Sequence, residues 1–217
     1  MITSDKSYDN LEIKRGYHED DKLGGSDPYS GSKGAAELVI NSYVKSYYKD
    51  GNIRIAVGRA GNVIGGGDWA KDRIIPDIIR SLNNNEVLKI RSPKATRPWQ
   101  HVLEPLSGYL TLAYNLSLSE SIHGQAFNFG PPPRSDYNVE QVLSELKKYF
   151  QNLKWDIVEN KNFKESQLLK LDCSKAKQIL NWESSMSFKE TIQFTSEWYN
   201  RFMENSSSIK QFSIDQI

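Results

Sequence analysis

The residues whose types and spacing most directly suggest chemistry are a tyrosine and a lysine four positions apart, Tyr29 and Lys33. Asp27 is a good helix cap and Pro28 fits a first helical position, so a helix is predicted from 28 to 48. Side chains four residues apart share one helix face. An ammonium beside a phenol favours the phenolate and lowers the phenol pKa from about 10. Such a phenol can take a proton from a hydroxyl group near neutral pH.

The same spacing is also compatible with an ordinary helix start, in which the tyrosine packs and the lysine extends along the surface. Tyr-x-x-x-Lys is a loose pattern, so the pair alone does not decide between the two interpretations. The elements around the pair and the other motifs decide between a catalytic and a purely structural interpretation.

Composition excludes several classes of function. The 217 residues are 38% hydrophobic and 25% charged, which is typical of a globular protein with one large domain or two small ones. The net charge of +1 gives no electrostatic reason to expect nucleic acid or an anionic membrane as partner. Cys173 is the single cysteine, so no internal disulfide forms, and a cytoplasmic location is predicted. The three histidines lie far apart in the sequence, and no metal site is predicted.

Helical and strand patterns alternate along the chain. Helices are predicted at 74–82, 104–116, 138–150, 174–180 and 187–203, and strands at 52–59, 87–90, 126–129 and 155–158. This alternation indicates an α/β protein: the C-terminal part of a Rossmann-like, doubly wound parallel sheet plus a small α+β substrate-binding lobe.

The predicted organisation has three segments. Residues 1–62 form part of a dinucleotide-binding domain, 63–203 are mainly a substrate lobe with some returning sheet elements, and 204–217 are a frayed polar tail. The apolar stub Met1-Ile2 is either disordered or the end of a buried strand. The glycine-rich segment 60–69 matches neither Gly-x-Gly-x-x-Gly nor the P-loop, so it is interpreted only as a binding loop.

Four motifs in order resemble a known family. Together they are similar to the second half of extended short-chain dehydrogenases/reductases (NAD-dependent epimerases/dehydratases), and within these to the CDP-glucose 4,6-dehydratases. The motifs are Thr3-Ser4-Asp5-Lys6-x-Tyr8-x-Asn10, the Tyr29/Lys33 pair, Arg59-x-x-Asn62-Val63-x-Gly65, and Arg97-Pro98-Trp99-Gln100-His101-Val102. The segments 65–69 and 97–101 favour the CDP-sugar type over the dTDP-glucose and GDP-mannose types.

The resemblance implies a role for each catalytic residue. Tyr29 would take the proton of the sugar O4 hydroxyl while NAD⁺ accepts the C4 hydride, and Lys33 would assist it and hold the nicotinamide ribose. Ser4 would hydrogen-bond the developing 4-keto oxygen. Lys6 would remove the C5 proton, and Asp5 would protonate the departing C6 hydroxyl. The implied product is CDP-4-keto-6-deoxyglucose, for deoxysugar and polysaccharide biosynthesis.

The resemblance also implies the binding residues. The cofactor is NAD, contacted by Thr3, Tyr29, Lys33, Ala60 and Val63. The substrate is CDP-glucose, contacted by Asn62, Arg73, Arg97, His101 and Asn128. Arginine suits a diphosphate because its planar fork donates paired hydrogen bonds. For Arg73 and Arg97 the alternative interpretation is a surface ion pair.

One departure from the family pattern leaves two functions open. The family fold opens with a Gly-x-x-Gly-x-x-Gly turn and several βα units, which these 217 residues do not contain. Either the chain is an enzyme half that acts with a separate N-terminal half, or it is a non-catalytic remnant; other epimerase or dehydratase chemistry is a weaker third possibility. We expect the chain alone to bind NAD⁺ weakly. We also expect apolar residues to be exposed, at Leu38, Val39, Val44 and the strand at 53–57, and the protein to form homo-oligomers through the Tyr29 helix.

Overall fold

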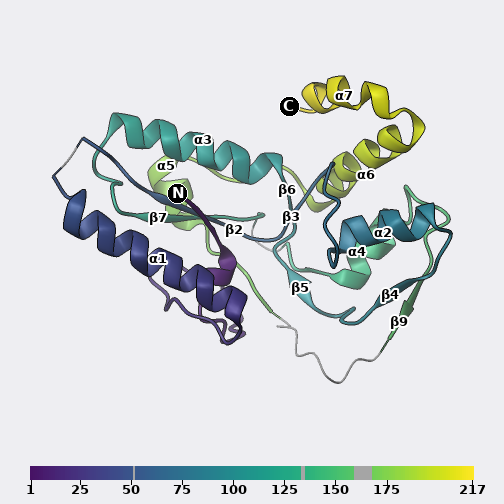
Figure 1. The fold of residues 1–217 in the computed structure, drawn as a ribbon, viewed down its shortest axis with the longest axis horizontal. Helices are drawn as coiled ribbons and strands as arrows, with labels where there is room; N and C mark the ends of the chain where they lie inside the picture. Colours follow the sequence, from purple (N-terminus) through teal and green to yellow (C-terminus); the bar gives the residue numbers. More distant parts are fainter. Residues whose placement is uncertain (51, 133–134, 159–167) are drawn as a thin grey trace.

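The computed structural model describes residues 1–50, 52–132, 135–158 and 168–217. Figure 1 shows two parts side by side: a sheet flanked by helices, and a lobe of helices with short strands. The α/β class predicted from the sequence is confirmed. Whether the two parts divide at residue 62 stays a prediction, because strand β7 (Ala126–Phe129) and helices from later in the chain complete the first part.

The first part is built on three parallel strands. Their order is β1 (Ile2–Ser4), β2 (Val57–Ala60) and β7, with Ser4 opposite Ala60 and Ala60 opposite Phe129. The N-terminal stub is therefore a strand and not a disordered tail. Because all three strands run the same way, their carboxyl ends meet at one edge of the sheet, where α/β proteins place their ligands.

Helices cover both faces of this sheet. In Figure 1, α1 (Pro28–Tyr47) and α3 (Leu103–Leu118) lie on either side of the strands, and α5 (Ser174–Leu180) packs against α3 and β7. The core on the α3 side consists of buried apolar side chains from β7, α3, α5 and the segments next to the strands and helices: Ala56, Leu112, Ile122, Phe127, Phe129, Ala176, Leu180 and Trp182.

The lobe has the larger apolar core. It packs α2 (Ile74–Asn83), α4 (Val139–Leu146) and α6 (Phe188–Glu204) against the parallel pair β4 (Leu88–Ile90) and β9 (Trp155–Ile157). Ile78, Ile79, Val142, Leu143 and Ile192 are fully buried there. The helix predicted at 138–150 is present as α4, but the α-helix ends at Leu146 and turns carry the chain on to 150.

Short two-residue strands join the two parts. β3 (Val63–Ile64) pairs in parallel with β6 (Gln100–His101), and β5 (Thr96–Arg97) pairs antiparallel with β8 (Tyr137–Asn138). These pairs bring the loop after β2 and the segment 96–101 to the junction of sheet and lobe. Residues from both parts therefore face the same space.

Three predictions about local structure are wrong. The strand predicted at 52–59 begins only at Val57. Val44, Ala56 and Val57, expected to be exposed, are buried, whereas Leu38, Val39 and Ile53 are exposed as predicted.

The predicted frayed tail is ordered, because α7 (Ile209–Asp215) packs on α6 and Ser213 Oγ accepts a hydrogen bond from Trp198 Nε1 at 2.8 Å. None of the helices in the described ranges combines the length and apolar character needed to cross a membrane.

Candidate active site

The short helix η1 (Asp5–Ser7) follows directly from β1 and carries the candidate acid and base. Ser4 caps it: its Oγ accepts a hydrogen bond from the Lys6 amide at 3.2 Å and donates one to Asp5 Oδ1 at 3.0 Å. Asp5 is only 2% exposed, and its Oδ2 has no hydrogen-bond partner. Burial raises the pKa of Asp5, against the opposing effects of Lys6, the Ser4 hydroxyl and Arg97. This environment favours a protonated carboxyl group.

The start of α1 brings the tyrosine to the same place. Both Tyr29 and Ser30 donate their amides to the capping carboxylate of Asp27, which fixes the first turn. Lys33 Nζ lies 5.4 Å from the centroid of the Tyr29 ring, so the predicted one-turn pairing is present. Tyr29 is 58% exposed and lines the same cavity as Ser4, Asp5 and Lys6.

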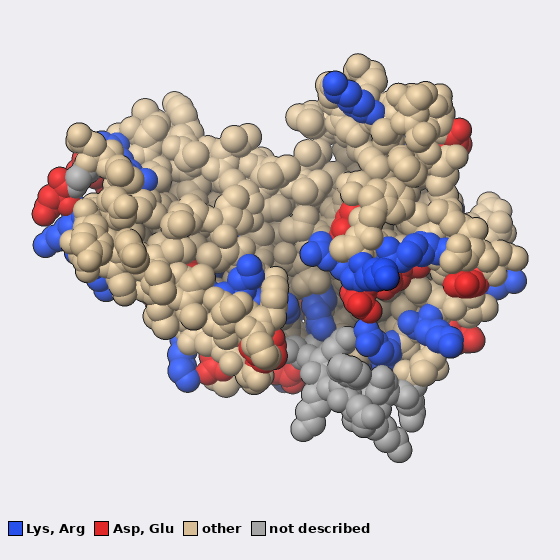
Figure 2. Space-filling model, in the orientation of Figure 1, with Lys and Arg blue, Asp and Glu red and all other residues tan. Residues whose placement is uncertain are grey.

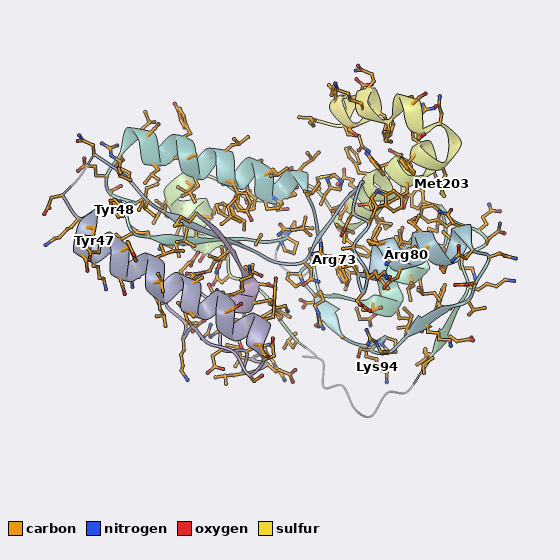
Figure 3. All side chains as sticks on the ribbon, viewed as in Figure 1. Tyr47, Tyr48, Arg73, Arg80, Lys94 and Met203 are labelled. Atoms are coloured by element: carbon orange, nitrogen blue, oxygen red, sulfur yellow. The ribbon has the colours of Figure 1, made fainter. Side chains whose placement is uncertain are left out.

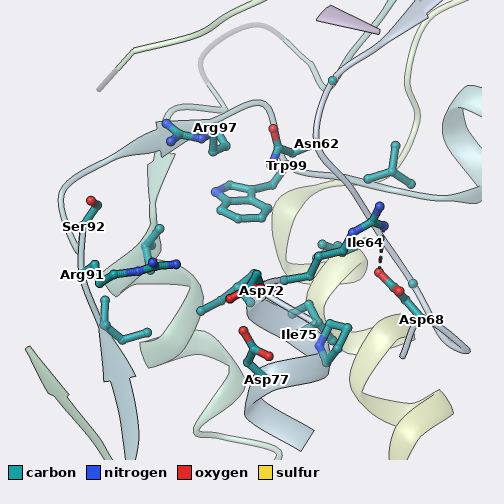
Figure 4. A pocket seen from close by; sticks show the side chains of 18 of the residues that line it. Asn62, Ile64, Asp68, Asp72, Ile75, Asp77, Arg91, Ser92, Arg97 and Trp99 are labelled. Carbon is teal, nitrogen blue, oxygen red and sulfur yellow. Dashed lines mark hydrogen bonds and ion pairs between the residues drawn. The ribbon is translucent and has the colours of Figure 1, made fainter. Parts of the chain in front are cut away.

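This cavity, of about 490 Å³, lies between the sheet edge and the lobe. Figure 4 shows it with Asn62, Arg97 and Trp99 toward the top, Arg91 and Ser92 at the left, Asp72 near the middle, and Ile75 and Asp77 toward the bottom. Arg73 also lines it and donates to Asp68 Oδ2 at 3.0 Å. The arginines and Asn62 predicted to contact substrate are thus in one space with the candidate catalytic residues.

Cationic side chains are concentrated around this space. Figure 2 shows Lys and Arg gathered about the hollow between the two parts of the molecule, and Figure 3 places Arg73 and Arg80 on the side of the lobe that borders it. Arg80 donates to the carbonyls of Trp69 and Ala70 and pairs with Asp77. The cavity itself is lined by cations and carboxylates together, so an anionic ligand would meet several cations there beside acidic groups. The cations are Lys6, Arg73, Lys89, Arg91 and Arg97, and the carboxylates are Asp5, Asp68, Asp72 and Asp77.

The glycine-rich loop is held by aromatic side chains of α6, a feature that the sequence reasoning missed. Trp69 contacts the rings of Tyr199 and Phe202, and Tyr199 OH donates to the carbonyl oxygen of Asp68 at 2.7 Å. A Cβ on Gly66 would lie 2.0 Å from the ring of Trp198, so only glycine allows this contact. The three α6 residues that make these contacts, Trp198, Tyr199 and Phe202, lie within the five positions 198–202, and that clustering was the available signal.

Several predicted site residues lie outside the cavity. His101 is buried against Phe194, and burial lowers its pKa to about 4. Asn128 accepts a hydrogen bond from Tyr8 OH and donates to two carbonyl oxygens. Thr3 donates its hydroxyl to Glu37 Oε1 at 2.6 Å.

Of the remaining predicted residues, one lines the cavity and two do not. Val63 lines the cavity, whereas Lys33 and Ala60 do not. Among the described residues, no cluster of three potential metal ligands is present. The ligand contacts assigned to these residues stay predictions.

A sequence model of the GDP-mannose 4,6-dehydratase family matches residues 1–195. The chain belongs to this family. It is 42% identical over 214 residues to the CDP-glucose 4,6-dehydratase of Salmonella typhimurium, covering 96% of this chain and 60% of that protein. It is also 27% identical over 142 residues to a dTDP-D-glucose 4,6-dehydratase of Dictyostelium discoideum, covering 65% and 30%.

Solved structures of similar fold include members that act on nucleotide sugars. The dTDP-glucose 4,6-dehydratase of Bacillus anthracis, solved with NAD, superposes with a TM-score of 0.78 at 21% identity, covering 94% of this chain and 61% of that one. DesIV of Streptomyces venezuelae, solved with NAD and TYD, gives 0.76 at 18%, covering 95% and 60%. At these identities the likeness shows the fold. The Salmonella enzyme and these two solved structures each align with more than nine tenths of this chain. The chain spans about three fifths of their length.

Proposed function

We propose that the chain carries the catalytic and sugar-nucleotide-binding part of an NAD-dependent CDP-glucose 4,6-dehydratase. The observation that carries the proposal is a buried carboxyl group, Asp5, with one unpartnered oxygen and a raised pKa in the cavity that Tyr29 and the arginines also line. The 42% identity to the Salmonella enzyme supports CDP-glucose as the substrate.

The residues present are compatible with a dinucleotide at the sheet edge. Ser4 and Ala60 end adjacent parallel strands, and the Lys33 ammonium and Tyr29 hydroxyl beside them are donors that a ribose can accept. Bound there, NAD would accept a hydride from the sugar C4 and return it to C6. Lys33 and Tyr29 would hold its ribose.

The chain's own groups would move the protons. Tyr29 takes the proton of the O4 hydroxyl, and Ser4 donates a hydrogen bond to the oxygen that becomes the 4-keto group. This polarisation acidifies C5, whose proton Lys6 removes. Asp5, whose pKa is raised by burial, gives its proton to the C6 hydroxyl, which leaves as water. The proton held by Lys6 would return to C5 as the hydride reaches C6. Adjacent Asp5 and Lys6 fit adjacent sugar carbons.

The diphosphate would lie among the arginines of the cavity. Arg73 and Arg97 line it together with Asn62, and each guanidinium can donate paired hydrogen bonds to phosphate oxygens. Asp68, which now pairs with Arg73, keeps that guanidinium oriented toward the cavity. We further propose a cytoplasmic homo-oligomer that associates through the exposed apolar side chains of α1, namely Leu38, Val39, Tyr43 and Tyr47.

The test is product formation from CDP-glucose with NAD⁺, measured by proton NMR in deuterated water. Conversion should produce a C6 methyl signal and place solvent deuterium at C5. The assay is run on the chain alone and together with the part of the Salmonella enzyme that the chain does not match. Turnover of dTDP-glucose equal to that of CDP-glucose would refute the substrate assignment, and no turnover in either preparation would favour a non-catalytic protein.

A further inference from the structure

Glu37 of α1 lies outside the cavity, yet it joins the two segments that supply the candidate catalytic groups. It stands one helical turn beyond Lys33 and two beyond Tyr29, and it is buried. Its Oε1 accepts a hydrogen bond from Thr3 Oγ1 at 2.6 Å and one from Arg59 Nε at 2.7 Å. Its Oε2 accepts one from Arg59 Nη2 at 2.5 Å. One carboxylate thereby connects α1, β1 and β2.

Arg59 is itself held in place from its other side. Its Nη1 donates to Tyr8 OH at 2.7 Å and to the carbonyl oxygen of Glu19 at 3.2 Å. Tyr8 OH in turn donates to Asn128 Oδ1 on β7 at 2.7 Å. Burial opposes the charge of Arg59, but the carboxylate of Glu37 and the hydrogen bonds to Glu37 and Tyr8 outweigh it and raise the pKa of the guanidinium. Glu37 is therefore bound to a buried, charged arginine. Through Tyr8, the hydrogen bonds of this arginine reach from β2 to Asn128 on β7.

Apolar packing does not fix the rotation of α1 in the same way. Only Gly34, Glu37 and Val44 of this 20-residue helix are buried, and the large apolar side chains Leu38, Val39, Tyr43 and Tyr47 face outward. A helix whose apolar residues point away from the sheet can turn about its axis at little hydrophobic cost. The polar contacts of Glu37 are specific in direction, so they set the rotation.

We propose that Glu37 is a positioning residue: by binding Thr3 and Arg59 together it fixes the turn of α1 that presents Tyr29 to the Ser4–Lys6 segment. Thr3 immediately precedes Ser4, so the same carboxylate also fixes that segment. The kinetic part of this inference rests on the proposed function. A misplacement of about 1 Å can cost on the order of 10²-fold in rate, so loss of the contact would slow turnover without removing any reacting group.

The decisive variant is Thr3→Val, which keeps the side-chain shape and removes only the donor to Glu37. Thr3→Ser restores a hydroxyl, and Ser42→Ala is the matched control: it removes a hydroxyl from the exposed side of the same helix, where Ser42 bonds only the Leu38 carbonyl. Glu37→Gln is the stronger variant, provided that its thermal unfolding stays cooperative.

We expect Thr3→Val to lower kcat about tenfold, the equivalent of losing one hydrogen bond of roughly 1.4 kcal/mol, with the KM values for CDP-glucose and NAD⁺ within twofold of the original. Thr3→Ser should recover most of kcat, and Ser42→Ala should change nothing. A raised KM for NAD⁺ with unchanged kcat would overturn the inference, because it would make Thr3 a cofactor ligand and nothing more.

Hydrogen exchange of the unliganded protein gives a readout that needs no activity. In Thr3→Val, amides in the first two turns of α1 and in residues 2–6 should exchange faster, while those of α6 should not change. Unchanged exchange in both segments would refute the inference even if the protein turned over no nucleotide sugar. Absence of turnover in the unsubstituted protein, with faster exchange in the variant, would instead refute only the proposed function.

Discussion

Two buried acidic groups near the end of β1, Glu37 on α1 and Asp5 on η1, differ in how their carboxyl oxygens are satisfied. The carboxylate of Glu37 accepts three hydrogen bonds, two of them from Arg59. The side chains of Glu37 and Arg59 are each about 4% exposed. Asp5 is as deeply buried, but one of its oxygens has no partner. The fully hydrogen-bonded carboxylate of Glu37 holds neighbouring elements together. The unpartnered oxygen of Asp5 costs folding free energy, and such buried unpaired groups are found at sites where the group takes part in a reaction.

The largest expected effect comes from breaking the satisfied pair. Arg59→Met leaves Glu37 buried without its cation, which should cost about 3–5 kcal/mol of unfolding free energy. The double variant Arg59→Met/Glu37→Leu removes both charges and should recover most of that loss. Urea unfolding of both variants measures the difference.

That double variant also separates stability from positioning. If Glu37 only stabilises the fold, recovery of stability should restore turnover as well. If it positions α1, kcat should stay low in a protein that is as stable as the original. Equal stability of the single and double variants would mean that the pair is solvated in solution, contrary to the structure.

The second prediction concerns the unsatisfied carboxyl group. Asp5→Asn should lower kcat by about 10²-fold or more, because the amide cannot donate a proton to the leaving hydroxyl. The thermal midpoint at neutral pH should stay the same or rise, because the substitution removes a buried carboxyl group whose ionised form lacks a full set of partners. A clear fall in the midpoint, at unchanged activity, would contradict both roles.

The sign of the pH effect at Asp5 follows from the raised pKa. The folded protein holds this proton more tightly than the unfolded chain, so stability falls as pH rises from the unfolded value near 4 through the folded value. The stability gained by Asp5→Asn should therefore be present at neutral pH and should disappear toward pH 4. Unfolding free energies at a series of pH values, with the unsubstituted chain as reference, test this.

His101 gives a smaller effect of opposite sign. Its pKa is lowered to about 4 by burial, so below pH 6.5 the unfolded chain takes up the proton first. Stability should fall as pH decreases from about 6.5 to 4, by at most roughly 3 kcal/mol. In His101→Phe this acid-side slope should flatten. A slope unchanged by the substitution would assign the loss to other groups.

The smallest effect is expected at the outward face of α1. Replacing Val39 and Tyr43 by Lys and Gln should leave unfolding of the monomer within about 0.5 kcal/mol, because both side chains are exposed. The same changes should shift the protein toward smaller species in sedimentation if this face mediates self-association. Ser42→Ala serves again as the control. An unchanged mass would remove α1 as the interface.

Local signals predicted most elements because each depends on neighbouring residues. The Asp27 cap fixes the start of α1, and the Ser187–Glu190 capping box fixes that of α6. The start of β2 could not be predicted: 53–55 alternates like a strand, but the ladder to β7 begins only where Val57 meets Ala126. Strand bounds depend on a partner that lies far away in the sequence.

The candidate site shows the same division. The Tyr29/Lys33 pairing is set by helix spacing and was predictable, as was the run Ser4–Lys6. The contact between Glu37 and Arg59 joins residues 22 positions apart, and no local sequence pattern predicts it. His101 and Asn128 were assigned to substrate on resemblance, yet their polar atoms face the interior, which only the three-dimensional packing reveals.

The aromatic contacts between α6 and the loop at 65–69 give the cavity an optical signal of its own. Trp69 lies on that loop, in contact with Tyr199 and Phe202, and Trp99 lines the cavity with its Nε1 donating to the Tyr137 carbonyl. A ligand that enters the cavity changes the polarity around the Trp99 indole. Intrinsic fluorescence can therefore report occupancy directly, without a label and without turnover.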